Sequence, residues 1–503
     1  MQQDTLTTDI DTSDLTPDQK EAFDILMAGD NVFLTGNAGT GKSYVLDKFI
    51  HVLKEREIDH IALAPTGIAA LNIEGGTTIH RTLKLPIGFL DPCNKKISPP
   101  QALNAAKIII IDEISMCRID LFERIMNLIR KAEKKYGRKQ VVLVGDFFQL
   151  PPVVTEQDEE LMMKFYPGNL DGWCFKSNFW HGYNFAPCVL KTVVRQIDPE
   201  FIENLDLARN GIKSCIPYFN RNAVSDRKFV KNDNNDTIFL CARNKLAENI
   251  NQEEMEKLNT SVVTFRASTE GKVNKGDKAA EDELRLCVGA KVMSLVNDKE
   301  GRYVNGSQGI VTNISKYSKK VSVRFFDSGE TVDIEPYTWE ILKSEGVSKL
   351  GADGKEQLEV KTKTIGKYKQ LPLKLAYAIT VHKSQGLTFS KCALHTKTFS
   401  AGQLYVGLSR CSSIDGLTVF PKIEPYRLHA SKDVIEFYNS LEQPKENNNA
   451  LNEEYQQITQ EQLQFENPQT KTETNTNTTT IECPKQYTEL VLKYIEFLEQ
   501  NVA

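Results

Sequence analysis

The feature that most constrains this chain is a glycine-rich loop at residues 36–43. It reads GNAGTGKS and matches the pattern GxxxxGK[ST]. The preceding segment, Asn31–Thr35, predicts a strand, and the following one, Tyr44–Leu53, predicts a helix. In that setting glycines let backbone N–H groups wrap phosphates, Lys42 reaches the β- and γ-phosphates, and Ser43 ligates Mg²⁺. We therefore predict an α/β domain that binds a nucleoside triphosphate through Gly36, Gly39, Thr40, Gly41, Lys42 and Ser43.

An apolar segment further along the chain ends in two acids. Ile108–Ile111 reads as a buried strand, and Asp112 and Glu113 follow it. Next to a phosphate loop, Asp112 would hold Mg²⁺ and Glu113 would activate the attacking water. Without the loop, an exposed strand end or a helix cap would explain the pair equally well.

Three further residues are candidates for nucleotide contacts. Gln19, in the segment LTPDQ, either completes a cap at Thr16 or reads an adenine edge, and the two interpretations stand equal. Arg195 and Arg410 follow apolar stretches, which would bring their guanidinium groups to the ends of elements and towards the γ-phosphate. For an isolated arginine, a surface salt bridge is the more common role.

Composition and charge exclude several classes of protein. The 503 residues are 40% hydrophobic and 26% charged, which excludes a wholly disordered chain, and no apolar run is long enough to span a membrane. The ten cysteines include no Cys-x-x-Cys pair, which argues against a zinc ribbon. The net charge is −5, but residues 442–503 carry −7, so the remaining 441 residues carry +2 and can still present a basic groove.

The first nineteen residues contain five Asp and no Lys or Arg. This composition is unlike that of a secretory or transit peptide, so we expect a cytoplasmic, nucleoid-associated protein of bacterial or phage origin.

Composition also divides the chain. We expect a flexible arm at 1–14, two parallel-sheet domains at 15–190 and 191–441, a disordered linker at 442–483 and an amphipathic helix at 484–503. Both domains contain four candidate buried strands with helical segments between them, which is typical of doubled α/β architecture. The candidates are Val32–Thr35, Ile61–Ala64, Ile108–Asp112 and Val141–Val144 in the first domain, and Thr237–Cys241, Ala376–Thr380, Lys391–His395 and Gly416–Phe420 in the second.

The pattern changes inside the second domain. Residues 301–341 predict short antiparallel strands with turns at Asn305-Gly306 and Ser328-Gly329, so we expect a small inserted β-barrel over 291–375. Its basic residues either clamp DNA or form a solvated turn. They are Lys316, Lys319 and Lys320.

Seven motifs of the chain resemble, in kind and order, those of superfamily-one DNA helicases. They are GNAGTGKS, APTGIAA, IIDEISM, GDFFQLPPV, VVRQ, AITVHKSQG and YVGLSR. The DEISM and GDFFQLPPV motifs, with RIDLFERI at 118–125, are most similar to Pif-type (petite integration frequency) helicases, which are related to the Rec-D and Dda helicases. The resemblance covers about residues 15–441.

The resemblance implies a fold and an activity. The fold would be two RecA-like motor domains with small insertions, namely a wedge at 81–105 and an SH3-like β-barrel. The activity would be ATP- and Mg²⁺-dependent 5′→3′ movement on single-stranded DNA, with unwinding of forked duplex, G-quadruplexes or RNA–DNA hybrids in replication, repair or recombination.

The resemblance also implies roles for individual residues. Those with roles in ATP chemistry would be Lys42, Ser43, Asp112, Glu113, Gln149, Arg195 and Arg410, with Gln149 sensing the γ-phosphate. Those lining the DNA track would be Pro65, Thr66, Thr78, His80, His382, Lys383 and Ser384.

The predicted track makes physical sense. Thr66 follows the strand at 61–64, and residues 382–386 follow the strand at 376–380. Small polar residues at carboxyl ends of strands can bond phosphates without reading sequence. Phe148, or its neighbour Phe147, could stack on bases, with ordinary packing as an even alternative.

The wedge and the partners are the least determined predictions. The segment LPIGFL at 85–90 forms an apolar tip, with Phe89 either separating duplex strands or folding against its own domain. A second functional reading is a DNA-stimulated ATPase translocase that is a subunit of a larger complex and does not unwind alone. We expect a monomer, with a possible protein partner at the terminal helix.

Overall fold

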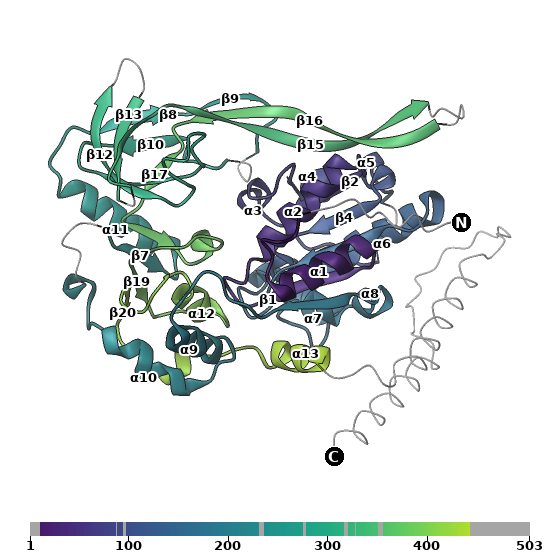
Figure 1. Cartoon of the computed structure of the whole chain (residues 1–503), viewed down its shortest axis with the longest axis horizontal. Helices are drawn as coiled ribbons and strands as arrows, with labels where there is room; N and C mark the ends of the chain where they lie inside the picture. Colours follow the sequence, from purple (N-terminus) through teal and green to yellow (C-terminus); the bar gives the residue numbers. More distant parts are fainter. Residues whose placement is uncertain are drawn as a thin grey trace, which may run out of the picture. The chain divides into compact units, whose positions relative to one another are not determined.

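The computed structural model describes residues 11–86, 88–93, 97–230, 236–274, 278–315, 320–326, 328–350 and 356–442 (Figure 1). The chain divides into one unit of residues 1–444 and a second of residues 445–503, and every described residue belongs to the first. Most of the predicted arm, the predicted linker after Glu442, the terminal helix, and the candidate lysines Lys316 and Lys319 lie outside the described residues.

The first domain is built on a six-stranded parallel sheet of order β3-β2-β4-β5-β1-β6. Its strands are β1 (Val32–Gly36), β2 (His60–Ala64), β3 (Thr77–Thr78), β4 (Ile108–Ile111), β5 (Gln140–Val144) and β6 (Ala186–Leu190). The central strands are buried along their whole length, as expected for a parallel sheet covered on both faces.

Helices cover both faces of this sheet. The helices are α1 (Pro17–Ala28), α2 (Lys42–Glu55), α3 (Gly67–Leu71), α4 (Ile79–Thr82), α5 (Gln101–Ala105), α6 (Ile119–Tyr136), α7 (Glu156–Phe165) and α8 (Asn178–Gly182). Residues of α1 and α2 share one hydrophobic core with the sheet, and residues of α5, α6 and α8 share the core on the opposite face.

The second domain has a four-stranded parallel sheet of order β18-β7-β19-β20. Its strands are β7 (Ile238–Cys241), β18 (Ala378–Thr380), β19 (Cys392–His395) and β20 (Leu417–Phe420), and its helices are α9 (Pro199–Arg209), α10 (Ile216–Phe219), α11 (Asn244–Glu256) and α12 (Gln403–Leu408). The prediction of two α/β domains with parallel sheets is thus confirmed.

The last described helix, α13 (Lys432–Glu442), belongs to the core of the first domain. Val434, Phe437 and Tyr438 are buried there beside Phe33 and Trp180. The predicted boundary, which assigned residues up to 441 to the second domain, is wrong for this helix. Helical periodicity shows that one face is apolar, but not which sheet that face covers.

An antiparallel insertion occupies the chain between α11 and β18. A five-stranded sheet of order β14-β13-β12-β11-β17 forms its main part. The strands of the insertion are β8 (Val263–Arg266), β9 (Ser268–Gly271), β10 (Glu283–Leu286), β11 (Lys291–Ser294), β12 (Gln308–Ser315), β13 (Lys320–Phe325), β14 (Thr331–Ile334), β15 (Tyr337–Leu350), β16 (Glu356–Gln370) and β17 (Leu373–Leu375). The insertion therefore begins near 263 rather than at 291, and its closure into an SH3-like barrel stays a prediction.

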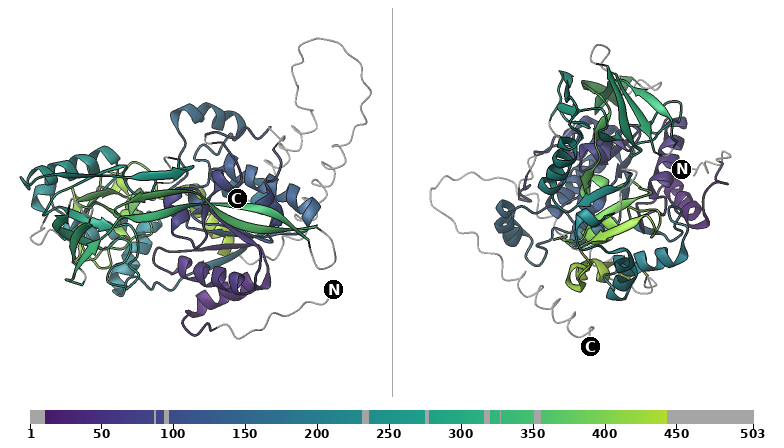
Figure 2. Two further views of the ribbon diagram at one scale, coloured as in Figure 1. Left: turned by 90° about the horizontal axis from the view of Figure 1, so that it is seen from above. Right: turned by 90° about the vertical axis from the view of Figure 1, so that its left-hand side faces the viewer.

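Strands β15 and β16 form a long antiparallel ribbon that extends from the insertion over the first domain (Figures 1 and 2). They are 14 and 15 residues long, whereas the sequence pattern predicted short strands. The ribbon contacts α4 and α5, and Arg81 donates a hydrogen bond to the Leu342 carbonyl at 3.4 Å. Within the described ranges, every helix is too short or too polar to cross a bilayer.

Candidate nucleotide site and neighbouring DNA surface

The glycine-rich loop lies where β1 ends and α2 begins. Gly39 and Gly41 have φ of +86° and +79°, and a Cβ on Gly36 would lie 2.3 Å from the Leu190 carbonyl oxygen. Glycine is therefore required for both backbone conformation and space. The Lys42 Nζ donates to the carbonyls of Gly36 and Asn37 at 2.8 and 3.0 Å, and burial lowers the pKa of Lys42 to about 8.

The two predicted acids lie at the end of β4. Asp112 accepts a hydrogen bond from the Glu113 backbone N–H at 2.8 Å, and Glu113 has φ of +50°. Burial raises the pKa of both carboxyls, and the negative charge of Asp112 raises that of Glu113 further, while Lys42 opposes both shifts. A cation at this position would relieve the unfavourable burial of the acids, which fits Mg²⁺ held with the phosphates of a nucleotide.

Gln19 supports the helix and the loop at once. The side chain is 3% exposed, its Oε1 accepts from the Thr16 N–H at 3.1 Å, and its Nε2 donates to the Thr40 carbonyl at 2.9 Å. It completes a capping box with Thr16. Both ends of the amide are therefore engaged, which favours the capping interpretation over the reading of adenine.

The two candidate arginines come from outside the loop and are close enough to influence each other. Arg410 is 2% exposed, and burial, reinforced by Arg195, lowers its pKa to about 9. Arg410 donates to the carbonyls of Val406, Ser384 and Leu387 at 2.9–3.4 Å. Neither arginine takes part in an ion pair among those described, so the surface salt bridge alternative is wrong for both.

Arg195 places a buried hydrogen-bond donor beside the phosphate loop. Its Nη1 is buried and lacks a hydrogen-bond partner in the described part of the chain, and its Cβ lies 2.6 Å from where a Cβ on Gly39 would be. A guanidinium with a buried, unpartnered N–H beside a phosphate loop, and with a second guanidinium near it, fits the phosphates of ATP.

Gln149 links the segment that follows β5 to the second domain. It is 8% exposed, its Nε2 lies 3.5 Å from Asp146 Oδ2, and its Oε1 accepts from Gln385 Nε2 at 3.3 Å. Asp146 is also bound by Arg209 of α9, with Nη2–Oδ1 at 2.9 Å.

Sequence reasoning missed four residues of this network. They are Asp146, Gln385, Arg209 and Tyr405, whose hydroxyl accepts from the Ala38 N–H of the loop at 2.9 Å. Asp146, Gln385 and Tyr405 lie inside motifs that were recognised, so the motifs themselves were the available signal. Arg209 lies in a helix outside these motifs, so no sequence signal indicated it.

The candidate DNA residues of the first domain lie at the carboxyl ends of two adjacent strands. Exposed Thr66 follows β2 and caps α3, and Thr78 ends β3 and caps α4, accepting backbone N–H bonds at 3.2 and 3.4 Å. Pro65 and His80 are half-buried beside them. Strands β2 and β3 pair directly, so these positions share one edge of the sheet.

The candidates of the second domain lie at the corresponding place, after β18. A short 3₁₀ helix, His382–Ser384, presents an exposed Lys383 and a half-buried His382, whose pKa burial lowers. Ser384 differs from the prediction, because its side chain is buried and donates to the Val381 carbonyl at 2.7 Å.

Of the two predicted aromatic contacts with DNA, the one at Phe148 needs correction. Phe148 is 4% exposed, with its ring 4.8 Å from that of Tyr438 and 4.1 Å from the Arg209 guanidinium, so base stacking by Phe148 is wrong for this arrangement. Phe89 stacks on Phe165 with ring centroids 5.7 Å apart, as in the alternative that folded it against its own domain. A wedge role for the segment stays a prediction.

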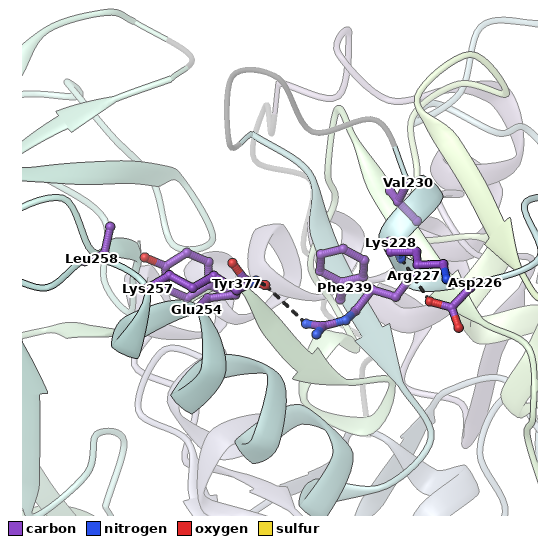
Figure 3. Close-up of a pocket in the computed structure, with 9 residues that line it drawn as sticks. All are labelled: Asp226, Arg227, Lys228, Val230, Phe239, Glu254, Lys257, Leu258 and Tyr377. Atoms are coloured by element: carbon purple, nitrogen blue, oxygen red, sulfur yellow. Dashed lines mark hydrogen bonds and ion pairs between the residues drawn. The ribbon is translucent and has the colours of Figure 1, made fainter.

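The second domain contains a cavity of 420 Å³ away from the loop (Figure 3). Arg227 and Lys257 line it, and both are paired with Glu254, at 3.3 and 2.7 Å. Asp226 and Lys228 also line the cavity, so charges of both signs surround it.

Comparisons with known proteins agree with this geometry. A family model described as PIF1-like helicase matches residues 14–202. The Campylobacter jejuni protein named ATP-dependent DNA helicase Pif1 is 33% identical over 451 residues, covering 82% of this chain and 95% of that relative.

Solved structures give the same result. Bacteroides Pif1 in complex with ADP-AlF4 is 33% identical and superposes with a TM-score of 0.73, covering 84% of this chain and 96% of the other. Bacteroides Pif1 bound to single-stranded DNA is also 33% identical, with a TM-score of 0.59 and coverage of 85% and 96%. Unliganded Bacteroides Pif1 superposes with a TM-score of 0.72, so this chain is more similar to the two structures without DNA than to the complex with DNA.

Proposed function

Since this chain belongs to the PIF1-like helicase family, we propose that it uses ATP to move 5′→3′ along single-stranded DNA and to separate the duplex ahead. It is an ATP-dependent DNA helicase, as its relatives are named. The observation that carries this function is the meeting of Lys42 and Glu113 with arginines from beyond the loop, one of which has a buried, unpartnered N–H.

The proposed chemistry follows from the placement of these groups. Lys42 leaves the carbonyls of the loop for the β- and γ-phosphates, and Glu113 accepts a proton from the attacking water. Arg195 and Arg410 neutralise charge that develops on the γ-phosphate. Mg²⁺, held by Ser43 and Asp112, would supply further charge neutralisation on the phosphates.

Movement on DNA requires two grips that change affinity in turn. We propose that Pro65, Thr66, Thr78 and His80 form one grip, and that His382 and Lys383 form the other. ATP contacts both domains through the loop and Arg410, so binding and release of nucleotide alter the separation of the grips.

The first test is unwinding of a duplex that carries a 5′ or a 3′ single-stranded tail, with ATP and Mg²⁺. We expect unwinding with the 5′ tail alone, and none by Lys42→Ala. Unwinding with the 3′ tail alone would contradict the polarity. DNA-stimulated ATPase without unwinding of either substrate would favour the second reading, a translocase that works as a subunit of a larger complex.

Further proposals concern substrates and partners. Forked duplexes, G-quadruplexes and RNA–DNA hybrids with 5′ tails are the substrates to compare in the same assay. Sedimentation tests the expected monomer. A pull-down with and without residues 484–503 tests the terminal segment as a docking site for a protein partner.

A further inference from the structure

A side chain of the second domain contacts Glu113, the predicted general base of the first domain. Gln385 follows the 3₁₀ helix His382–Ser384, and its Nε2 donates to Glu113 Oε2 at 2.9 Å. The same Nε2 lies 3.3 Å from Gln149 Oε1. Gln385 therefore lies between the predicted general base and the predicted γ-phosphate sensor.

Glu113 needs such a contact to keep one orientation. Its backbone adopts φ of +50°, a left-handed conformation that is unfavourable for a residue with a side chain. Its own N–H bonds to Asp112, so the backbone is fixed while the side chain still has three rotatable bonds. In the described part of the chain, Gln385 supplies the hydrogen bond that holds this carboxylate.

The segment that carries Gln385 also contacts the other working parts. Its neighbours His382 and Lys383 belong to the proposed DNA grip. The carbonyls of Ser384 and Leu387, on either side of Gln385, accept hydrogen bonds from Arg410 at 3.4 and 3.3 Å. A shift of this backbone on DNA binding therefore moves the Gln385 amide and the Arg410 guanidinium together.

We infer that Gln385 is a positioning residue that aims the Glu113 carboxylate at the attacking water and makes hydrolysis respond to DNA at His382–Lys383. The inference rests on the proposed function and adds to it the connection between the DNA grip and the general base. Gln385 donates through an uncharged amide, so it orients the Glu113 carboxylate without protonating it.

The test replaces Gln385 with Met, which keeps the length of the side chain and removes the amide. The full chain is assayed for ATP hydrolysis with and without saturating oligo(dT), for oligo(dT) affinity by fluorescence anisotropy, and for thermal stability. We expect the DNA-stimulated kcat to fall about 10- to 100-fold, with KM for ATP and DNA affinity within about twofold of wild type.

A matched control is available on α11. Gln252 Nε2 donates to Glu256 Oε1 at the same 2.9 Å, but on an exposed helix face. Gln252→Met should leave kcat, KM and DNA affinity unchanged. If Gln385→Met does not fold, Gln385→Asn keeps the amide but is one methylene too short to reach Glu113, so the same loss of kcat is expected.

The outcomes separate this inference from the proposed function. Wild-type protein without DNA-stimulated ATPase would contradict the function itself. If DNA stimulates wild type and Gln385→Met equally, the inference alone is overturned. If Gln385→Met is unfolded, a fully active Gln385→Asn overturns it in the same way. A loss of DNA affinity that accounts for the fall in kcat would also overturn it, because Gln385 would then act in the grip.

Discussion

At the scale of single residues, Lys42 shows how the phosphate loop is prepared for nucleotide. Its ammonium group bonds two carbonyls of the loop and is buried, which lowers its pKa to about 8. Phosphate oxygens offer this cation better partners than carbonyls do, because they are charged. We expect Lys42→Ala to lower kcat for ATP hydrolysis at least about 100-fold.

The proposed DNA grips consist of other residues, so oligo(dT) affinity of Lys42→Ala should stay within about twofold of wild type. Fluorescence anisotropy measures this, and a parallel loss of ATPase and DNA binding would instead indicate that the variant is misfolded.

Glu113 permits a more selective change. Glu113→Gln keeps the size of the side chain and an oxygen that can accept from Gln385, but it removes the base. We expect ATP to bind with near wild-type affinity and hydrolysis to slow about 10²- to 10⁴-fold. Binding of a fluorescent ATP analogue and steady-state turnover check the two halves of this prediction. Normal turnover would show that another group is the general base.

The sequence predicted the residues whose chemistry is local. Loop glycines and a strand that ends in two acids are readable because their function depends on neighbours in the chain. Phe148 and Phe89 were not predictable, since an aromatic side chain in a motif does not reveal whether a distant helix covers it. Tyr438 and Arg209 pack on Phe148 from α13 and α9, which are remote in sequence.

At the scale of elements, the start of α1 is tied to the end of β6 by Asp18. Its carboxylate accepts from the N–H groups of Lys191 and Thr192 at 2.7 and 2.8 Å. Burial opposes ionisation of Asp18, but hydrogen bonds from the Thr16 hydroxyl and from these N–H groups outweigh it and lower the pKa to about 2.

A lowered pKa in the folded state stabilises the protein above the unfolded pKa of about 4, and the contribution is lost as the pH falls towards 2. Because Asp18 is only partly buried, we expect Asp18→Asn to lose about 1 kcal/mol of unfolding free energy at pH 7 and about a third of that near pH 2.5. Urea unfolding at both pH values measures the difference. Asp24→Asn, an exposed change on the same helix, is the control, and a loss that does not depend on pH would contradict the prediction.

The helices and strands also show which features of a fold the periodicity of the sequence does not predict. Eight strands of the two parallel sheets were predicted, because continuous β-branched runs are typical of buried parallel strands. The two edge strands of the first sheet, β3 and β6, were not predicted. The long β15–β16 ribbon was not predicted. Its alternating Lys, Thr and Glu residues resemble those of a polar loop, and each strand is extended only because it pairs with the other. Helix α13 was assigned to the wrong domain for a related reason, since its apolar face fits an aromatic cluster that only the fold assembles.

At the scale of the whole molecule, the two domains are joined by a buried ion pair beside the nucleotide site. Arg209 of α9 binds Asp146, which follows β5 and whose side chain is fully buried. The Arg209 guanidinium lies 4.1 Å from the Phe148 ring and 4.9 Å from the Tyr438 ring. The pair therefore connects α9 of the second domain with the sheet and the α13 helix of the first.

Removing the cation leaves a buried carboxylate without its partner, so we expect Arg209→Met to cost about 3–5 kcal/mol of unfolding free energy. Adding Asp146→Asn to the same chain should recover part of this loss, because the uncompensated charge is gone. The control is Arg302→Met, which breaks an exposed bidentate pair with Asp298 at 2.7 and 3.0 Å and should lower the stability far less than Arg209→Met does.

Urea unfolding followed by tryptophan fluorescence and by far-ultraviolet circular dichroism tests whether the pair couples the domains. Both variants are made in a Trp339→Phe parent, which removes the tryptophan of the insertion and leaves Trp173 and Trp180 in the first domain. If the pair couples the domains, the parent unfolds in one transition with both probes, and Arg209→Met separates the fluorescence transition from that of circular dichroism, which reports on the whole chain. Equal losses in Arg209→Met and Arg302→Met, with coincident transitions in both, would show that the domains are held together by other contacts.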